Sequence, residues 1–154
     1  MGLFDIFKKK KKTKEVDIDI LQQQMYQSIF NKLAKFLPQR WKKVDFHLYH
    51  TSKYFGIKYF VLTENNQWLD CFEYLDKQTK DNLFDSIDKE VAKTWNQLPD
   101  KHKWYVLNLI VDNQGHIDVN YDYADEVKDD DEKLFSYLFN EEKEWAKKFD
   151  KEII

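Results

Sequence analysis

The chain has 154 residues, of which 42% are hydrophobic, 34% charged and 17% aromatic, so it fits one folded domain with a sizeable core rather than a disordered chain. Only 3 Gly and 2 Pro are present, which excludes glycine-rich nucleotide loops and disfavours all-β folds with many tight turns. One Cys excludes an intramolecular disulfide, and neither a membrane-spanning apolar run nor a secretory signal is evident, so we expect a cytoplasmic protein.

The formal net charge of −3 conceals an uneven distribution of charge along the chain. Residues 1–14 contain six Lys and one Asp, which gives +5. Of the 25 basic and 28 acidic residues in the whole chain, 19 basic and 27 acidic therefore remain for residues 15–154, or −8. A domain that binds nucleic acid normally has the opposite sign, so we expect no direct contact with nucleic acid.

The first 14 residues are predicted to be a flexible lysine-rich leader, followed by a single domain over residues 15–154. Basic residues gain about 1 kcal/mol each near an anionic lipid surface, so this leader suggests weak membrane contact. The other interpretation is a disordered leader without a role. The candidate membrane contacts are Leu3, Phe4, Ile6, Phe7, Lys8, Lys9 and Lys10.

The first predicted element is a helix over residues 17–37, because apolar residues recur there at spacings of three and four until Pro38 ends the pattern. Alternating apolar and polar residues then indicate half-buried strands that are bounded by turn signals. These three predicted strands span residues 41–51, 55–64 and 67–75.

The second half of the chain begins with a predicted helix over residues 79–98, which has one apolar stripe. Strands predicted at residues 103–112 and 116–124 are joined by a turn in which Gly115 can take a positive φ. The last helix is predicted to begin near Asp131. The order α-β-β-β-α-β-β-α predicts an α+β domain, with a largely antiparallel five-stranded sheet and helices packed on one face.

No sequence motif of a known catalytic or metal centre is present. The chain lacks GxSxG, HExxH and CxxC, and His47 and His50 lie three residues apart on a predicted strand, so they point to opposite faces. Acid–base catalysis by paired carboxylates would need a pocket and a raised pKa, which a sequence does not show. We therefore predict no enzymatic activity, no catalytic residue and no cofactor.

The acidic residues partly match one known metal site, the calcium-binding loop of an EF-hand. Asp118, Asn120 and Asp122 match the first ligands of an EF-hand loop. Tyr123 then stands where the loop needs Gly, and Asp129 stands where it needs a bidentate Glu. We therefore predict no metal.

Several features spread over about residues 20–125 carry a family resemblance. They are Tyr26 in the leading helix, the Pro-x-x-Trp-x-x-Val spacing of Pro38, Trp41 and Val44, Trp104 before the fourth strand, Gly115 at the turn, and the acidic-aromatic stretch VNYDYAD after it. In these features the chain resembles the YezG-like immunity proteins of bacteria. The resemblance implies a protein without enzymatic activity that binds a secreted toxin, often a nuclease, and protects the producing cell.

The acidic stretch from His116 to Lys133 is the candidate binding site. Asp118, Asn120 and Asp122 should share one face of the fifth strand, while the other face should be buried through Ile117, Val119, Tyr121 and Tyr123. A nuclease has a basic cleft, which an acidic surface can occupy or rim. The candidate toxin-binding residues are Asp118, Asn120, Asp122, Asp125, Glu126, Asp129 and Asp130.

Two alternatives remain open at this point. The acidic stretch also fits a solvated surface with acids at a helix start, because charge runs are often only surface. The leader also fits a peripheral membrane adaptor that attaches through its apolar and basic residues.

Overall fold

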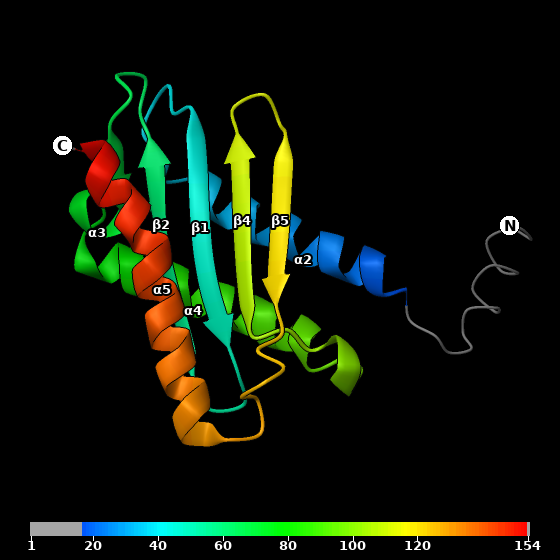
Figure 1. Ribbon diagram of the computed structural model, residues 1–154. Coiled ribbons are helices and arrows are strands. Elements are labelled where there is room, and N and C mark those ends of the chain that lie inside the picture. The colour runs from blue at the N-terminus through cyan, green and yellow to red at the C-terminus, as the bar shows by residue number, and fades with distance from the viewer. Residues whose placement is uncertain (1–16, 154) are drawn as a thin grey trace, which may run out of the picture.

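The computed structural model describes residues 17–153, with the side chains of residues 17–149, as a five-stranded sheet with helices on both of its faces (Figure 1). The strands are β1 (Lys43–His50), β2 (Phe55–Leu62), β3 (Trp68–Asp70), β4 (Val106–Asp112) and β5 (Ile117–Asp122). The helices are α2 (Ile18–Ala34), α3 (Cys71–Tyr74), α4 (Lys77–Trp95), the 3₁₀ turn η1 (Asp100–His102) and α5 (Asp131–Ile153). The leader predicted over residues 1–14 lies outside the described residues.

The sheet has the order β3-β2-β1-β4-β5, and every neighbouring pair of strands is antiparallel. The central strand β1 places Phe46 between Tyr59 of β2 and Leu109 of β4. Between β4 and β5, Gly115 takes a φ of 90°. The α+β class, the antiparallel five-stranded sheet and the broad order of the elements are therefore confirmed.

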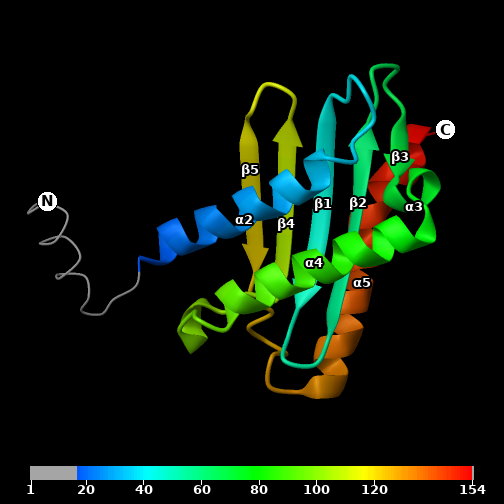
Figure 2. The same ribbon diagram turned by 180° about the vertical axis from the view of Figure 1, so that it is seen from behind.

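The largest part of the core lies between one face of the sheet and the two helices α2 and α4, which cross in front of the strands in Figure 2. The helices contribute residues at spacings of three and four, such as Met25, Ile29 and Leu33 of α2, all of which are completely buried. Every second residue of the strands, such as Phe46 and Tyr59, meets them from the sheet.

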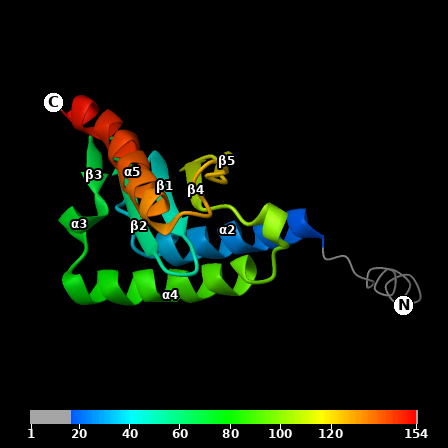
Figure 3. The ribbon, with the colours of Figure 1, turned by 60° about the horizontal axis from the view of Figure 1, so that its bottom comes forward.

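Helix α5 packs on the opposite face of the sheet, so the prediction that all helices lie on one face is wrong (Figure 3). The reason is that β2 is apolar on both faces: Phe60 points away from Tyr59 and needs a cover of its own. Trp145 and Phe149 of α5 supply that cover together with Trp68, and the rings of Phe60 and Phe149 stack at 4.1 Å.

The strand predicted over residues 67–75 ends at Asp70, and α3 follows it directly. The Asp70 carboxylate accepts the N–H of Phe72, and the Glu73 carboxylate accepts the N–H of Asp70, which forms a capping box. Two of the three predicted helices have shifted ends: α2 ends at Ala34, and α4 spans Lys77–Trp95.

Candidate functional site

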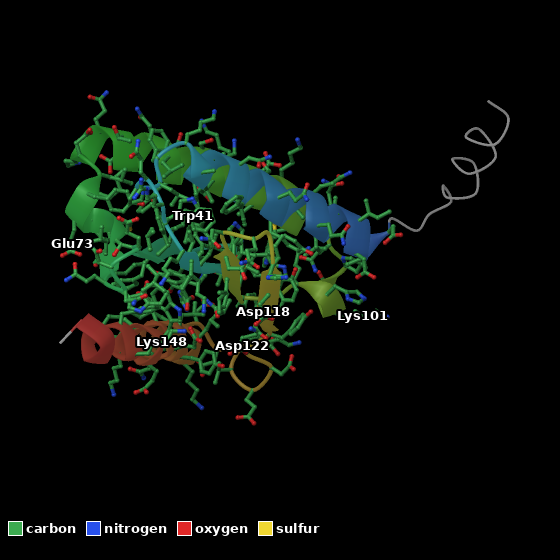
Figure 4. All side chains as sticks on the ribbon, turned by 90° about the horizontal axis from the view of Figure 1, so that it is seen from above. Trp41, Glu73, Lys101, Asp118, Asp122 and Lys148 are labelled. Atoms are coloured by element: carbon green, nitrogen blue, oxygen red, sulfur yellow. The ribbon has the colours of Figure 1, made fainter. Side chains whose placement is uncertain are left out.

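Strand β5 presents its polar residues on the face of the sheet where α5 lies. Val119 and Tyr121 pack against the core with α2 and α4, while Asn120 and Asp122 line a hollow beside α5. Figure 4 shows Asp122 on the same side of the sheet as Lys148 of α5. The predicted alternation is thus present, although Ile117, which was expected to be buried, is 44% exposed at the end of the strand.

We call the seven candidate residues the acidic surface. They come from β5 and from the segment that joins β5 to α5: Asp118, Asn120, Asp122, Asp125, Glu126, Asp129 and Asp130. Residues 118–132 contain eight acids and only one basic residue, Lys128. Because these residues follow one another along a strand, a short connection and a helix start, the fold keeps their charges together.

Three of these side chains support the local structure. Asp122 accepts the N–H of Ala124 at 2.9 Å and the hydroxyl of Tyr137. Asp130 accepts the N–H of Lys133 at 3.1 Å, at the start of α5. Asp125 lies 3.6 Å from Lys128 in an exposed ion pair, which contributes little.

The other four side chains, those of Asp118, Asn120, Glu126 and Asp129, are exposed. Among the residues that the structure describes, these side chains have no hydrogen bond or ion pair. They therefore face solvent with their acceptor oxygens free to bind another molecule.

The connection between β5 and α5 is held by a small apolar cluster. Ala124 takes a positive φ of 47°, a conformation that costs a non-glycine residue roughly 1 kcal/mol. It is kept there by the bond from its N–H to Asp122 and by packing against Val106, Leu134 and Leu138. The acids at positions 125–130 are consequently mounted on a segment with a defined path rather than on a loose loop.

Two hollows open along this side of the molecule. The first, of about 240 Å³, is lined by His47, Val106, Asn108, Asn120, Tyr121, Asp122, Glu141 and Trp145. The second, of about 340 Å³, is lined by Asp122, Ala124, Asp125, Glu126, Val127 and Tyr137. Asp122, at the end of β5, lines both hollows.

A buried carboxylate fixes α5 to the sheet beside these hollows. Asp45 of β1 is 2% exposed and accepts the side-chain amide of Asn108 and the indole N–H of Trp145, both at 2.9 Å. Lys148 lies 2.7 Å away and supplies the opposite charge. These partners satisfy the carboxylate, and two of them belong to α5.

A second polar link joins the sheet to α5 through His47, two residues after Asp45 on β1. The Nε2 atom of His47 lies 2.6 Å from the Glu141 carboxylate, and the ring packs 4.7 Å from Trp145. His47 is 1% exposed, and its buried Nδ1 atom has no hydrogen-bond partner among the described residues. On the other face of the sheet, the ring of His50 lies 4.7 Å from Trp95 of α4, so the two histidines do point apart.

Sequence reasoning did not include His47, Asn108, Tyr137 and Glu141 in the candidate site. Glu141 is 94 residues from His47 in the chain, so no local pattern relates them. The amphipathic pattern of α5 predicts that its Trp and Phe face the core, but it does not indicate which face of the sheet they cover.

The described residues show no arrangement typical of a catalytic or metal centre. Over residues 17–153, no three His, Cys, Asp or Glu side chains come together as metal ligands. Burial raises the pKa of the Cys71 thiol to about 12, so its thiol is a poor nucleophile at neutral pH. None of the helices in the same range is long and apolar enough to span a membrane.

Comparisons with known proteins agree with the resemblance noted in the sequence. No curated protein matches the chain. The model of the family described as immunity protein YezG-like matches residues 22–149, from the first turns of α2 to Phe149 in α5. The match covers all five strands, the acidic surface and both hollows. The chain therefore belongs to the YezG-like family of immunity proteins.

Proposed function

We propose that this protein protects the cell that makes it by binding a cognate toxin through the acidic surface, without turnover. The family assignment supports an immunity role and implies a toxin as partner. The observation that supports this particular surface is its composition: eight acids against one Lys over residues 118–132, with four acceptor side chains unengaged.

The toxin is proposed to be a nuclease that the protein meets in the cytoplasm. A nuclease must hold a polyanion, so its active cleft is basic. The immunity protein carries −8 over residues 15–154 and offers a concentrated negative surface to such a cleft. Opposite fields of this kind raise association rates toward about 10⁸–10⁹ M⁻¹s⁻¹ at low salt, which suits an inhibitor that must act before damage accumulates.

The first experiment is capture of the partner from lysate of the source cells on the immobilised full chain. A basic polypeptide retained in a one-to-one ratio, released by salt and active as a nuclease when free, is the expected result. Adding the chain back should stop the nuclease. A retained partner that is not basic, or a nuclease that the chain does not inhibit, contradicts the proposal.

The second experiment locates the surface by charge reversal. Asp118, Glu126 and Asp129 are changed together to Lys, because these side chains support no local structure. The matched control reverses three exposed acids that pair with lysines elsewhere: Asp81, Asp85 and Glu144. We expect the first variant to lose inhibition while the control retains it. Equal inhibition by the two variants, with both folded by circular dichroism, would reject the acidic surface.

A further inference from the structure

The hollow between α5 and the strands β4 and β5 is lined, among the described residues, by two carboxylates and by no Lys or Arg. We call it the α5 groove and define it by six of its lining residues: His47, Asn108, Asn120, Asp122, Glu141 and Trp145. In Figure 1, α5 lies in front of β2 and leaves β4 and β5 open on that side. The groove is therefore accessible from the acidic surface.

Two of the side chains that line the groove have their N–H donors engaged, whereas the amide of Asn120 is unpaired among the described residues. The amide nitrogen of Asn108 donates to the Asp45 carboxylate at 2.9 Å and to the carbonyl of Phe46 at 3.0 Å, which leaves only its oxygen to bind a guest. The indole N–H of Trp145 also donates to Asp45. The indole ring is thus left as an apolar wall.

His47 lines the groove and has one ring nitrogen without a partner among the described residues. The carboxylate of Glu141 only accepts, so the ring nitrogen Nε2 that contacts it at 2.6 Å carries the proton. The other ring nitrogen, Nδ1, is buried and has no hydrogen-bond partner among the described side chains or backbone. A buried polar atom without a partner costs free energy, so this nitrogen is an unsatisfied hydrogen-bonding group beside the groove.

Two carboxylates stand on opposite walls of the groove, Asp122 on β5 and Glu141 on α5. Asp122 already accepts two hydrogen bonds, and Glu141 accepts one from His47. A carboxylate has about four lone-pair sites, so both retain capacity for a donor. In the described part of the chain, no Lys or Arg lines the groove, and His47 beside Glu141 is the one lining residue that can carry a positive charge.

The size of the groove matches a side chain rather than a metabolite. Its volume of about 240 Å³ is below the range of about 300–1,000 Å³ that is usual for small-molecule sites. Of the two basic side chains, Arg presents five donors in a planar fork and stacks on aromatic rings, whereas Lys presents one compact ammonium. A groove with several acceptors on two walls and an indole wall fits the fork.

We propose that the α5 groove receives an arginine side chain of the toxin, with its guanidinium between Asp122 and Glu141. This inference rests on the proposed function, because it takes the toxin as the partner that supplies the arginine. The chain's own single arginine, Arg40, pairs with Glu64 at 3.4 Å and does not line the groove. An arginine in the groove would add one specific contact to the general electrostatic attraction. A few such contacts supply most of the binding free energy in protein interfaces.

The test uses the full chain, labelled with ¹⁵N, and an arginine probe in place of the toxin. Nα-acetyl-arginine amide is titrated while the side-chain amide signals of Asn108 and Asn120 and the indole signal of Trp145 are followed. We expect saturable shifts of these three signals. The citrulline analogue has the same shape without the charge, and the lysine analogue has the charge without the fork. Both should bind more weakly.

The matched variants are Glu141→Gln and Glu144→Gln. Both remove one negative charge from α5, but Glu144 pairs with Lys147 and does not line the groove. The amide oxygen that Glu141→Gln introduces can still accept the hydrogen bond from His47, so the fold should be retained, which thermal unfolding checks. We expect Glu141→Gln to weaken arginine binding at least about tenfold, which is about 1.4 kcal/mol, and Glu144→Gln to leave it unchanged.

Three results would contradict arginine binding in the α5 groove: no saturable shift of the signals, equal shifts with the citrulline analogue, or equal affinities of the two variants for the arginine probe. None of them bears on whether a toxin is bound through the rest of the acidic surface, which the capture and charge-reversal experiments decide. Conversely, a chain that binds arginine in the groove but captures and inhibits no nuclease would contradict the proposed function alone.

Discussion

The hydroxyl of Tyr137, two turns into α5, donates a hydrogen bond to the carboxylate of Asp122 at the end of β5. This bond joins the last strand to the last helix across the segment that carries most of the acidic surface. Burial, and then the contact with Asp122, raise the pKa of Tyr137, so the phenol stays protonated and remains a donor at neutral pH.

Removing this hydroxyl should loosen the connection between β5 and α5. Tyr137→Phe leaves the Asp122 carboxylate with one donor fewer, and we expect the free energy of unfolding to fall by about 1–2 kcal/mol in urea titrations. The control is Tyr54→Phe, because the hydroxyl of Tyr54 has no hydrogen bond among the described residues. If the two variants lose the same stability, the bond to Asp122 is not what holds the connection.

The Asp45 carboxylate is predicted to be the strongest polar attachment of α5 to the sheet. Asp45→Asn removes a buried charge that faces Asn108, Trp145 and Lys148, and we expect a loss of about 1–3 kcal/mol in the free energy of unfolding, because the Lys148 ammonium left behind is partly exposed. The near-ultraviolet circular dichroism of Trp145 should change as α5 detaches. Chemical denaturation monitored by both signals measures the effect.

A matched control for Asp45 lies in the same row of the sheet. Asp45 of β1 and Asp118 of β5 both pair with Ile110, from either side of β4, but Asp118 is exposed. The same substitution at Asp118 should change stability by no more than about 0.5 kcal/mol. An equal loss of unfolding free energy at the two positions would mean that the buried hydrogen bonds of Asp45 do not stabilise the fold more than an exposed carboxylate does.

His50 should make the fold sensitive to mild acid. Burial against Trp95 and Phe55 lowers its pKa to about 4 from the ordinary 6.5. Between these two values the unfolded chain binds the proton and the folded chain does not, so stability falls as the pH falls. From pH 7.5 to pH 5, the contribution of His50 should decrease by about 2 kcal/mol.

The pH dependence can be assigned to His50 by substitution. His50→Gln removes the titrating group, so its unfolding free energy should change less between pH 7.5 and pH 5 than that of the natural chain, by about the same 2 kcal/mol. Only the difference between the two pH values is compared, so a constant cost of the substitution does not matter. Parallel curves for the two proteins would contradict the depressed pKa.

The lysine-rich leader gives a prediction that is independent of the toxin. Vesicles that contain anionic lipid should retain the full chain at low salt, and deletion of residues 1–14 should abolish this retention. Neutral vesicles are the control for the lipid charge. Toxin inhibition should survive the deletion, because the acidic surface lies elsewhere in the chain. Retention that persists without the leader would refute lipid contact through it.

Periodicity in the sequence was enough to predict most of the fold. The spacing of apolar residues in α2 and their alternation with polar residues in β1, β4 and β5 predict which side chains face the core. These patterns are local in the sequence. The strand predicted through Leu75 was too long because an apolar run does not show that Asp70 caps a helix. The placement of α5 was missed because Phe60 was not recognised as the centre of a second apolar face.

In the candidate site, too, the residues that are close together in the sequence could be predicted, and those that are far apart could not. The acids from Asp118 to Asp130 are neighbours in sequence, so a composition argument finds them. His47 and Glu141 become neighbours only when α5 returns across the sheet, and nothing local in either segment indicates the other. The structure also separates roles that the sequence treats alike, because Asp122 and Asp130 hold the chain while Asp118 and Glu126 are free.

Strand β5 is an edge strand, with β4 as its only neighbour among the described strands, and such edges invite pairing between copies of a protein. If two copies paired antiparallel about Asn120, Asp118 of each would stand opposite Asp122 of the other, and like charges in cross-strand positions repel. The acidic side chains thus disfavour aggregation through pairing of β5 strands from two copies. Copies of this protein should therefore repel one another at this edge unless another molecule neutralises the charge.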